Sequence, residues 1–167
     1  SNKKAETEAT FQMYAADAGI APRIYGYIAS NKVDQWKTFV DGIPSISKGP
    51  KILMEMMDKT LQEYIESKDN KSLSEKDQYS LISLALDMDK LEISHNDPNP
   101  LNFMVRDDIF YYIDFGMSKF IKDIKNEELR YHGHPNVKAL GTVLEGGMQG
   151  LKTRKIIKGG FDIILKY

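Results

Sequence analysis

Two acidic side chains and one amide side chain stand at the ends of a stretch that the sequence predicts to be a β-hairpin. Short apolar runs at 102–105 and 109–113 flank a charged turn, which is the pattern of a hairpin. A hairpin brings its two open ends together. We therefore expect Asp97 and Asn102 at its entrance to lie beside Asp114 at its exit. Carboxylate and amide oxygens of this kind suit Mg²⁺ that is held jointly with a substrate's phosphates.

The same residues also allow a purely structural interpretation. The segment 96–100 is rich in turn-forming residues, so Asp97 and Asn102 could form an Asx turn that leads into the hairpin. This alternative gives no reason for the run Asp114-Phe115-Gly116 at the other end of the hairpin.

The chemical interpretation matches a known family. The order His-x-Asp-x4-Asn, ending at Asn102, is followed twelve residues later by Asp114 and then Phe-Gly. This order resembles the catalytic loop and the metal loop of protein kinases. In that family the loop Asp orients the attacking hydroxyl and accepts its proton, and the other two residues hold magnesium. The resemblance implies that Asp97 is the catalytic base and that Asn102 and Asp114 are metal ligands.

The resemblance also implies structural roles for three neighbours of these residues. His95 would brace the catalytic loop by packing and hydrogen bonding, as buried histidines commonly do, and would take no part in the chemistry. Phe115 and Gly116 would be structural parts of the metal loop.

The N-terminal segments extend the resemblance. Residues 4–18 carry apolar side chains at helical spacing, Gly19 stands where such a helix would end, and 23–28 is dense in β formers. This helix and strand look like helix αC and strand β4 of small atypical kinases of the KEOPS-subunit and RIO types. The resemblance makes Glu8 the αC glutamate, a cofactor-binding residue that pairs with the phosphate-binding lysine. Glu6 competes for this role, and a solvated glutamate on the helix surface is the plain alternative.

The apolar run 51–57 predicts a buried strand. It resembles strand β5 and the hinge of kinases, whose backbone groups bind the adenine edge of ATP. On this basis Glu55 and Met57 supply the backbone contacts, and the Met54 side chain guards the nucleotide pocket. The alternative is that these methionines only fill the core.

Helix and loop signals occupy the rest of the first ninety residues. The breaker-rich passage 29–50 predicts a loop, with a short strand at 36–40. Capping boxes at 60–63 and 72–75 each predict the start of a helix, the second being long, amphipathic and ending near Lys90. The resemblance places this helix at αE, which precedes the catalytic loop in kinases.

The C-terminal part carries weaker signals. His132 and His134 suggest a metal site, but two histidines in a Gly/Pro loop without cysteines are more simply loop residues. The segment 136–144 resembles the start of helix αF, with Asn136 in place of an Asp. The stretch lacks the Ala-Pro-Glu of protein kinases, and we assign no family role to the basic segment 148–167.

Composition sets broad limits on the class of protein. The chain has 167 residues, of which 41% are hydrophobic and 28% charged, with a formal net charge of −1. These values are those of an ordinary globular domain, and bulk charge gives no nucleic-acid signal. The sequence has no cysteine, no signal peptide and no run of about 20 apolar residues, so we expect an intracellular, cytoplasmic protein without membrane contact.

Together these patterns predict an α+β, kinase-like fold. Residues 1–57 would form a partial N-lobe with αC, β4, β5 and the hinge, and 58–167 would form a mostly helical C-lobe. The function that the resemblance implies is an ATP- and Mg²⁺-dependent atypical serine/threonine kinase that acts on a protein substrate.

Two alternatives stay open. Asn99 stands where protein kinases usually carry a lysine, and the His-Asn-Asp spelling resembles the small-molecule kinases of the aminoglycoside and choline types. The chain also begins at the αC-like helix, without the glycine-rich loop and lysine strand of kinases. These missing parts would suit a pseudokinase that acts as a scaffold.

Overall fold

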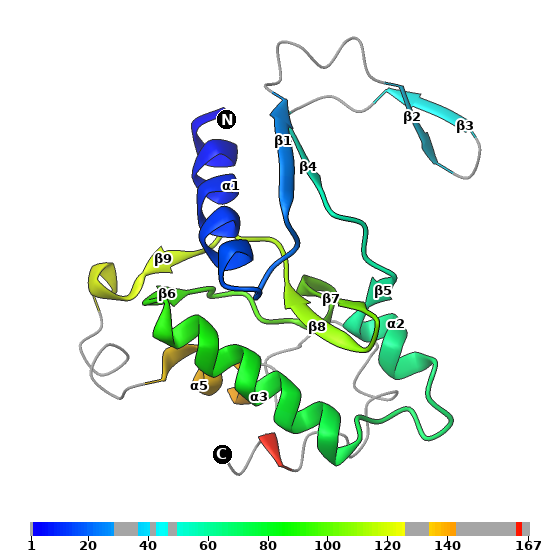
Figure 1. The fold of residues 1–167 in the computed structure, drawn as a ribbon, viewed down its shortest axis with the longest axis vertical. Coiled ribbons are helices and arrows are strands. Elements are labelled where there is room, and N and C mark those ends of the chain that lie inside the picture. Colours follow the sequence, from blue (N-terminus) through cyan, green and yellow to red (C-terminus); the bar gives the residue numbers. More distant parts are fainter. Residues whose placement is uncertain are drawn as a thin grey trace.

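Helices and small antiparallel sheets alternate along the part of the chain that the structure describes. This computed structural model describes residues 2–28, 37–40, 43–46, 50–125, 134–142 and 163–164. The described residues form a mixed α+β arrangement in which every strand pairing is antiparallel. In Figure 1, helix α1 stands beside strands β1 and β4 in the upper part of the view, while helices α3 and α5 lie in the lower part.

The N-terminal helix and strand are confirmed. Helix α1 spans Asn2–Asp17, and strand β1 spans Ile24–Ile28. The helix ends at Asp17, and Gly19 follows in the turn with a φ of +76°, which glycine adopts without strain. Strand β1 pairs with strand β4, Lys51–Met54, to form a two-stranded sheet.

Two predictions for the region around β4 were wrong. The first placed a buried strand over 51–57, but β4 ends at Met54 and Leu53 is 52% exposed. Its sheet pairs only β1 with β4, and one face of such a sheet stays open to solvent when a helix covers the other. The second placed one short strand in the passage 29–50. Strand β2, Lys37–Val40, confirms that strand, but it pairs with an unpredicted strand β3, Ile43–Ile46.

Strand β3 was missed because it contains Pro44, which cannot donate a ladder hydrogen bond. Proline is tolerated where the nitrogen of a strand residue faces away from the partner strand, as in a two-stranded sheet. The breaker residues in this passage therefore favour a loop in the sequence without excluding a strand in the fold.

The predicted hairpin is confirmed. Strands β7, Phe103–Arg106, and β8, Ile109–Tyr112, pair with Phe103 opposite Tyr112. Asp107 and Asp108 form the turn with φ of +51° and +60°, and two consecutive positive φ angles define the hairpin turns that match strand twist. Strand β5, Lys59–Thr60, adds to β7 and makes a three-stranded sheet.

Both helices that follow β4 are confirmed, but one predicted cap was wrong. Helix α2 spans Leu61–Glu66, and the Thr60 hydroxyl caps it by accepting from the backbone N–H of Glu63. Helix α3 spans Glu75–Lys90 and is capped by Ser74, which accepts from the N–H of Asp77 at 3.1 Å. The sequence predicted the capping box at 72–75. Both serines have an acidic residue three positions later, so spacing alone did not separate them.

Short elements complete the described chain. Strands β6, Ile93–Ser94, and β9, Lys119–Phe120, pair with each other. The 3₁₀ turn η2, Pro100–Asn102, leads into β7, and η3, Ile121–Asp123, follows β9. Helix α5 spans Pro135–Thr142 and packs against α3. His132 and nearly all of the predicted basic segment 148–167 lie outside the described residues.

The core lies where α3, α5 and the hairpin meet. Leu81, Ala85 and Met88 repeat along one face of α3 and are fully buried, and Phe103 and Tyr112 of the hairpin are buried as well. This apolar face at helical spacing fixes how the hairpin sits on α3. Within the described ranges, no helix is both long and apolar enough to cross a lipid bilayer.

Candidate functional site

Asp97 is held by two neighbouring amide side chains. Asn102 Nδ2 donates to Asp97 Oδ2 at 2.8 Å and to its backbone oxygen at 3.0 Å. Asn99 Nδ2 donates to the other carboxylate oxygen, Oδ1, at 3.0 Å. Asn99 also caps η2 by accepting from the N–H of Leu101 at 2.9 Å. These bonds fix the orientation of the carboxylate without placing a cation beside it.

The hairpin brings residues 113–116 to the same end as Asp97. The N–H of Ile113 donates to the backbone oxygen of Asn102 at 2.9 Å, which continues the β7–β8 pairing by one residue. Asp114 follows directly and has an exposed side chain. Its φ of +59° is unusual for a residue other than glycine, and such left-handed residues collect at functional sites. The three predicted residues therefore lie around one sheet edge.

His95 connects the two loops, as its predicted bracing role requires. The side chain is fully buried, and Nε2 donates to the backbone oxygen of Ile113 at 2.8 Å. Its Nδ1 accepts from the N–H of Asp97 at 3.3 Å. Burial lowers the pKa of His95, so the ring is neutral at pH 7 and can accept at one nitrogen while it donates at the other. The ring also packs edge-on against Phe115 at 5.1 Å between centroids.

Glu8 of α1 lies beside Gly116, whereas Glu6 is exposed. A Cβ atom added to Gly116 would lie 3.3 Å from Asp114 Oδ1 and 3.5 Å from Glu8 Oε2. The two carboxylates therefore meet at Gly116, where a side chain would crowd both. Burial, together with the nearby charge of Asp114, raises the pKa of Glu8. The burial of Glu8 and its proximity to Asp114 thus disfavour the ionised form of Glu8.

Some polar groups of the residues assigned to the hinge already have hydrogen-bond partners within the protein. The N–H of Glu55 donates to the backbone oxygen of Arg23 at 2.8 Å, and its carboxylate pairs with Arg106. The backbone oxygen of Glu55 and the N–H of Met57 are therefore the groups left for a ligand. Met54 is half-buried, and its sulfur accepts from Gln12 Nε2 at 3.6 Å.

Asn96, to which the sequence assigned no structural role, connects the segment before the hairpin to the segment after it. Asn96 Nδ2 donates to the backbone oxygen of Met117 at 3.0 Å, and its Oδ1 accepts from the Ser94 hydroxyl at 2.7 Å. Asn96 has a φ of +67°. Asparagine is one of the few residues that tolerate this conformation, and that preference is the only local signal that could have identified it.

A protein-only metal cage is not formed by the described residues. Among them, no three His, Cys, Asp or Glu side chains come together as a metal site. The exposed ring of His134 lies with Nδ1 at 3.8 Å from Asp89 Oδ2, so its observed neighbour is a buried carboxylate of α3. The set Asp114 and Asn102 suits only a cation that also has ligands from a bound substrate.

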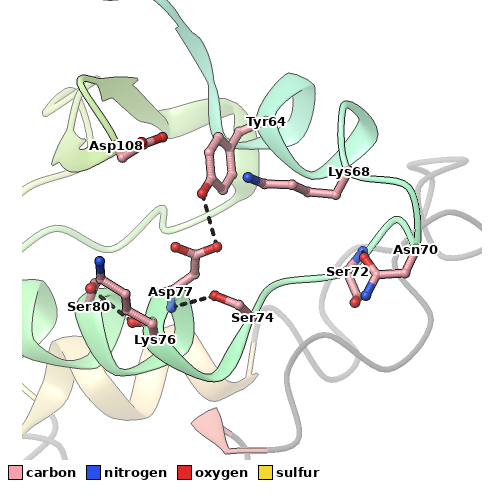
Figure 2. Close-up of a pocket in the computed structure, with 9 residues that line it drawn as sticks. All are labelled: Tyr64, Lys68, Asn70, Ser72, Ser74, Lys76, Asp77, Ser80 and Asp108. Atoms are coloured by element: carbon pink, nitrogen blue, oxygen red, sulfur yellow. Dashed lines mark hydrogen bonds between the residues drawn. The ribbon is translucent and has the colours of Figure 1, made fainter.

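A polar cavity of about 300 Å³ lies beside the N-terminus of α3, away from these residues (Figure 2). The Tyr64 hydroxyl donates to Asp77 Oδ2 at 3.0 Å, and Lys68 Nζ lies 4.1 Å from the centre of the Tyr64 ring. Figure 2 shows the Tyr64 hydroxyl turned toward Asp77 and the Lys68 side chain extended toward Tyr64. No residue of the predicted site lines this cavity.

Comparison with known proteins does not identify a family. The chain matches no model of a known protein family, and a search of curated proteins finds no matching relative. The motifs and the geometry of Asp97, Asn102 and Asp114 are therefore the basis for assigning a function.

Proposed function

We propose that this protein is an ATP- and Mg²⁺-dependent phosphotransferase of the atypical serine/threonine kinase type. Asp97 is the base that receives the proton of the acceptor hydroxyl. Asn102 and Asp114 are the protein ligands of the metal, and the acceptor is a hydroxyl group of a protein substrate.

The observation that supports the proposal best is the joint placement of Asp97, Asn102 and Asp114 at one end of the β7–β8 hairpin. Phosphoryl transfer requires little covalent chemistry from the protein, because positioning and charge stabilisation supply most of the rate. Fixed orientation of the base and an exposed carboxylate beside it are the features that such a site needs.

The donor set fits Mg²⁺ rather than a metal that prefers sulfur or imidazole. Asn102 uses its amide nitrogen to hold Asp97, which leaves its oxygen Oδ1 as the ligand atom. Asp114 offers an exposed carboxylate. Mg²⁺ commonly takes only one or two protein oxygens together with substrate phosphates, and when bound it neutralises the charge of those phosphates.

Asp97 can act as a base only if its carboxylate stays aimed at the acceptor. Asn99 and Asn102 each donate to a different carboxylate oxygen, so rotation of the carboxylate would break both bonds. Hydrogen bonds from neutral amides also leave lone pairs on each oxygen for a substrate hydroxyl. Asp97 is half-buried, so one side of it stays accessible.

A small-molecule phosphotransferase is the second candidate function, and Asn99 favours it. The position two residues after the base carries a lysine in most protein kinases, whereas here an amide contacts Asp97 Oδ1 at 3.0 Å. An acceptor recognised without that lysine could be an amino alcohol or an aminoglycoside.

Ligand-induced stabilisation tests the proposal first. ATP with Mg²⁺ at a hundred times its dissociation constant should stabilise the protein by about 2.7 kcal/mol, measured as an increase in Tm that disappears when Mg²⁺ is withheld. Transfer of labelled γ-phosphate to protein, amino-alcohol and aminoglycoside acceptors then separates the two candidate functions. Stabilisation without transfer to any of these acceptors would indicate a nucleotide-binding scaffold. The absence of both stabilisation and transfer would refute the proposal.

A further inference from the structure

Asn136, in the first turn of α5, joins three separate segments of the fold. Its side chain is 2% exposed. Oδ1 accepts from the backbone N–H of His95 at 2.9 Å, and Nδ2 donates to Asp89 Oδ1 at 2.7 Å and to the backbone oxygen of Ile93 at 2.6 Å. The N–H of Asn136 donates to the same Asp89 oxygen at 2.9 Å. Helix α5 is thereby connected to the end of α3 and to the start of the catalytic loop.

Asp89 determines which way the Asn136 amide faces. An ionised carboxylate and a backbone carbonyl can only accept hydrogen bonds, so the donor end of the amide must point at Asp89 and Ile93. The acceptor end is then turned to the N–H of His95. The opposite orientation would place oxygen against two oxygens and NH₂ against an N–H, so the amide, the Ile93 oxygen and the N–H of His95 would all lose these bonds, and Asp89 Oδ1 would keep only the N–H of Asn136.

The Asp89 carboxylate is itself an unusual group to find at this place. It is 9% exposed and lies near the end of α3. Burial raises the pKa of Asp89, while the bonds from Asn136 and from the N–H of Val137 oppose that increase. Desolvation of a carboxylate is unfavourable, so its retention here is best explained by what its bonds accomplish.

The bonds of Asn136 lead directly to the candidate site. The residue whose N–H it fixes, His95, contacts the N–H of Asp97 through Nδ1 and the oxygen of Ile113 through Nε2. Asp114 follows Ile113 in the chain. A shift of the His95 backbone would therefore move the base and the metal loop relative to each other.

We propose that Asp89 and Asn136 are positioning residues, with Asp89 holding the Asn136 amide in the one orientation that fixes the catalytic loop. The effect on turnover rests on the proposed function, whereas the effect on the loop does not. Neither residue contacts the candidate ligand groups directly, so their contribution should be to rate and not to nucleotide affinity.

Exchange of the two side-chain types provides the test. Asn136→Asp places two carboxylates within hydrogen-bond distance and removes the donor to Ile93. We expect kcat to fall about tenfold, the factor set by one lost hydrogen bond to a charged group, with KM for ATP nearly unchanged. The double variant Asp89→Asn/Asn136→Asp removes the repulsion between the two carboxylates, but it does not restore the donor to Ile93, and one atom of residue 89 cannot both accept from the N–H of residue 136 and donate to its side chain. It should therefore recover part of kcat. Asp87→Asn, a half-buried position two residues earlier in α3, is the matched control and should change neither parameter.

Amide hydrogen exchange over residues 93–97, without nucleotide, provides a readout that does not depend on activity. Protection of this segment should fall in Asn136→Asp, recover in part in the double variant and stay unchanged in Asp87→Asn. If global stability falls while this protection and kcat keep their wild-type values, or if the double variant recovers neither, the positioning role is wrong. If protection changes as expected but the wild-type protein neither binds nor uses ATP, the proposed function fails and the positioning of the loop stands.

Discussion

The side-chain amide of Asn102 donates to the carboxylate of Asp97 at 2.8 Å and to its backbone oxygen at 3.0 Å. Both protons of one amide are thus used to hold one aspartate. The position of the candidate base therefore depends on the candidate metal ligand, and a substitution of either residue should change the orientation of the other.

Removal of the Asn102 amide should destabilise the protein. Asn102 is 7% exposed, and Asn102→Ala leaves the backbone oxygen and Oδ2 of the half-buried Asp97 without this donor. We expect the free energy of unfolding to fall by about 1–3 kcal/mol, measured by urea denaturation at pH 7. Asn70→Ala, at an exposed position, is the control. If the free energy of unfolding fell equally in the two variants, the hydrogen bonds of Asn102 would contribute no specific stabilisation.

Asp114→Asn tests the metal ligand. Asparagine tolerates the positive φ of this position, so the variant should fold, but the charge that attracts the cation is lost. Phosphate transfer should fall by about a hundredfold or more, and the Mg²⁺-dependent increase in Tm with ATP should disappear. Asp107→Asn makes the same change at another exposed aspartate with positive φ and should retain both effects. Unchanged turnover in Asp114→Asn would remove this residue from the site.

The cap of α3 can be identified by a pair of matched substitutions. Ser74→Ala removes the hydroxyl that accepts from the N–H of Asp77, and this should cost about 1 kcal/mol of stability. Ser72→Ala should have little effect on the helix, because Ser72 lies two residues before the cap. Thermal unfolding of both variants decides between them. A larger loss in Ser72→Ala would restore the capping box expected from the sequence.

Two buried tyrosines should respond oppositely to loss of their hydroxyl groups. The Tyr112 hydroxyl is buried and finds no hydrogen-bond partner among the described residues, so Tyr112→Phe should be neutral or stabilising by up to about 1 kcal/mol. Burial, and to a lesser degree the charge of Asp89, raises the pKa of Tyr112, so the group stays neutral at any ordinary pH. Tyr64→Phe loses the bond to Asp77 and should be destabilising. Chemical denaturation of both variants tests this contrast, which a destabilised Tyr112→Phe would contradict.

The ion pair between Glu55 and Arg106 predicts a pH dependence. The hydrogen bond from Arg106 lowers the pKa of Glu55 below its ordinary value of 4.5. A lowered pKa in the folded state gives stability that is present above the unfolded value and is lost as the pH falls through the folded value. Arg106→Gln should therefore be less stable than wild type at pH 7, and the difference should shrink at about pH 3.

Unfolding curves at the two pH values check this prediction. Lys90→Gln is the control, because its ion pair with Asp87 has side chains that are 78% and 49% exposed and should contribute little. If Arg106→Gln shows the same deficit at both pH values, the loss comes from packing of the arginine side chain and not from the ion pair.

Local sequence signals determined the elements of the candidate site. Helix α1, the hairpin and the start of α2 follow from apolar spacing, turn residues and a capping box, all of which act between residues close together in the chain. The hairpin also predicted that Asp97, Asn102 and Asp114 would share one sheet edge. Where two local signals competed, as for the serines at the start of α3, the sequence could not rank them.

Contacts between distant segments were decided only by the tertiary structure. The choice of Glu8 over Glu6 depends on which helix face meets Gly116, more than a hundred residues later. The link from Asp89 through Asn136 to His95 joins the end of α3, the first turn of α5 and the segment before the hairpin, and no local sequence pattern predicts it. Spacing along a chain specifies which side of a helix or strand is apolar. The hydrogen-bond partners of buried polar groups are decided later, when the packing of the elements leaves each group one partner within reach.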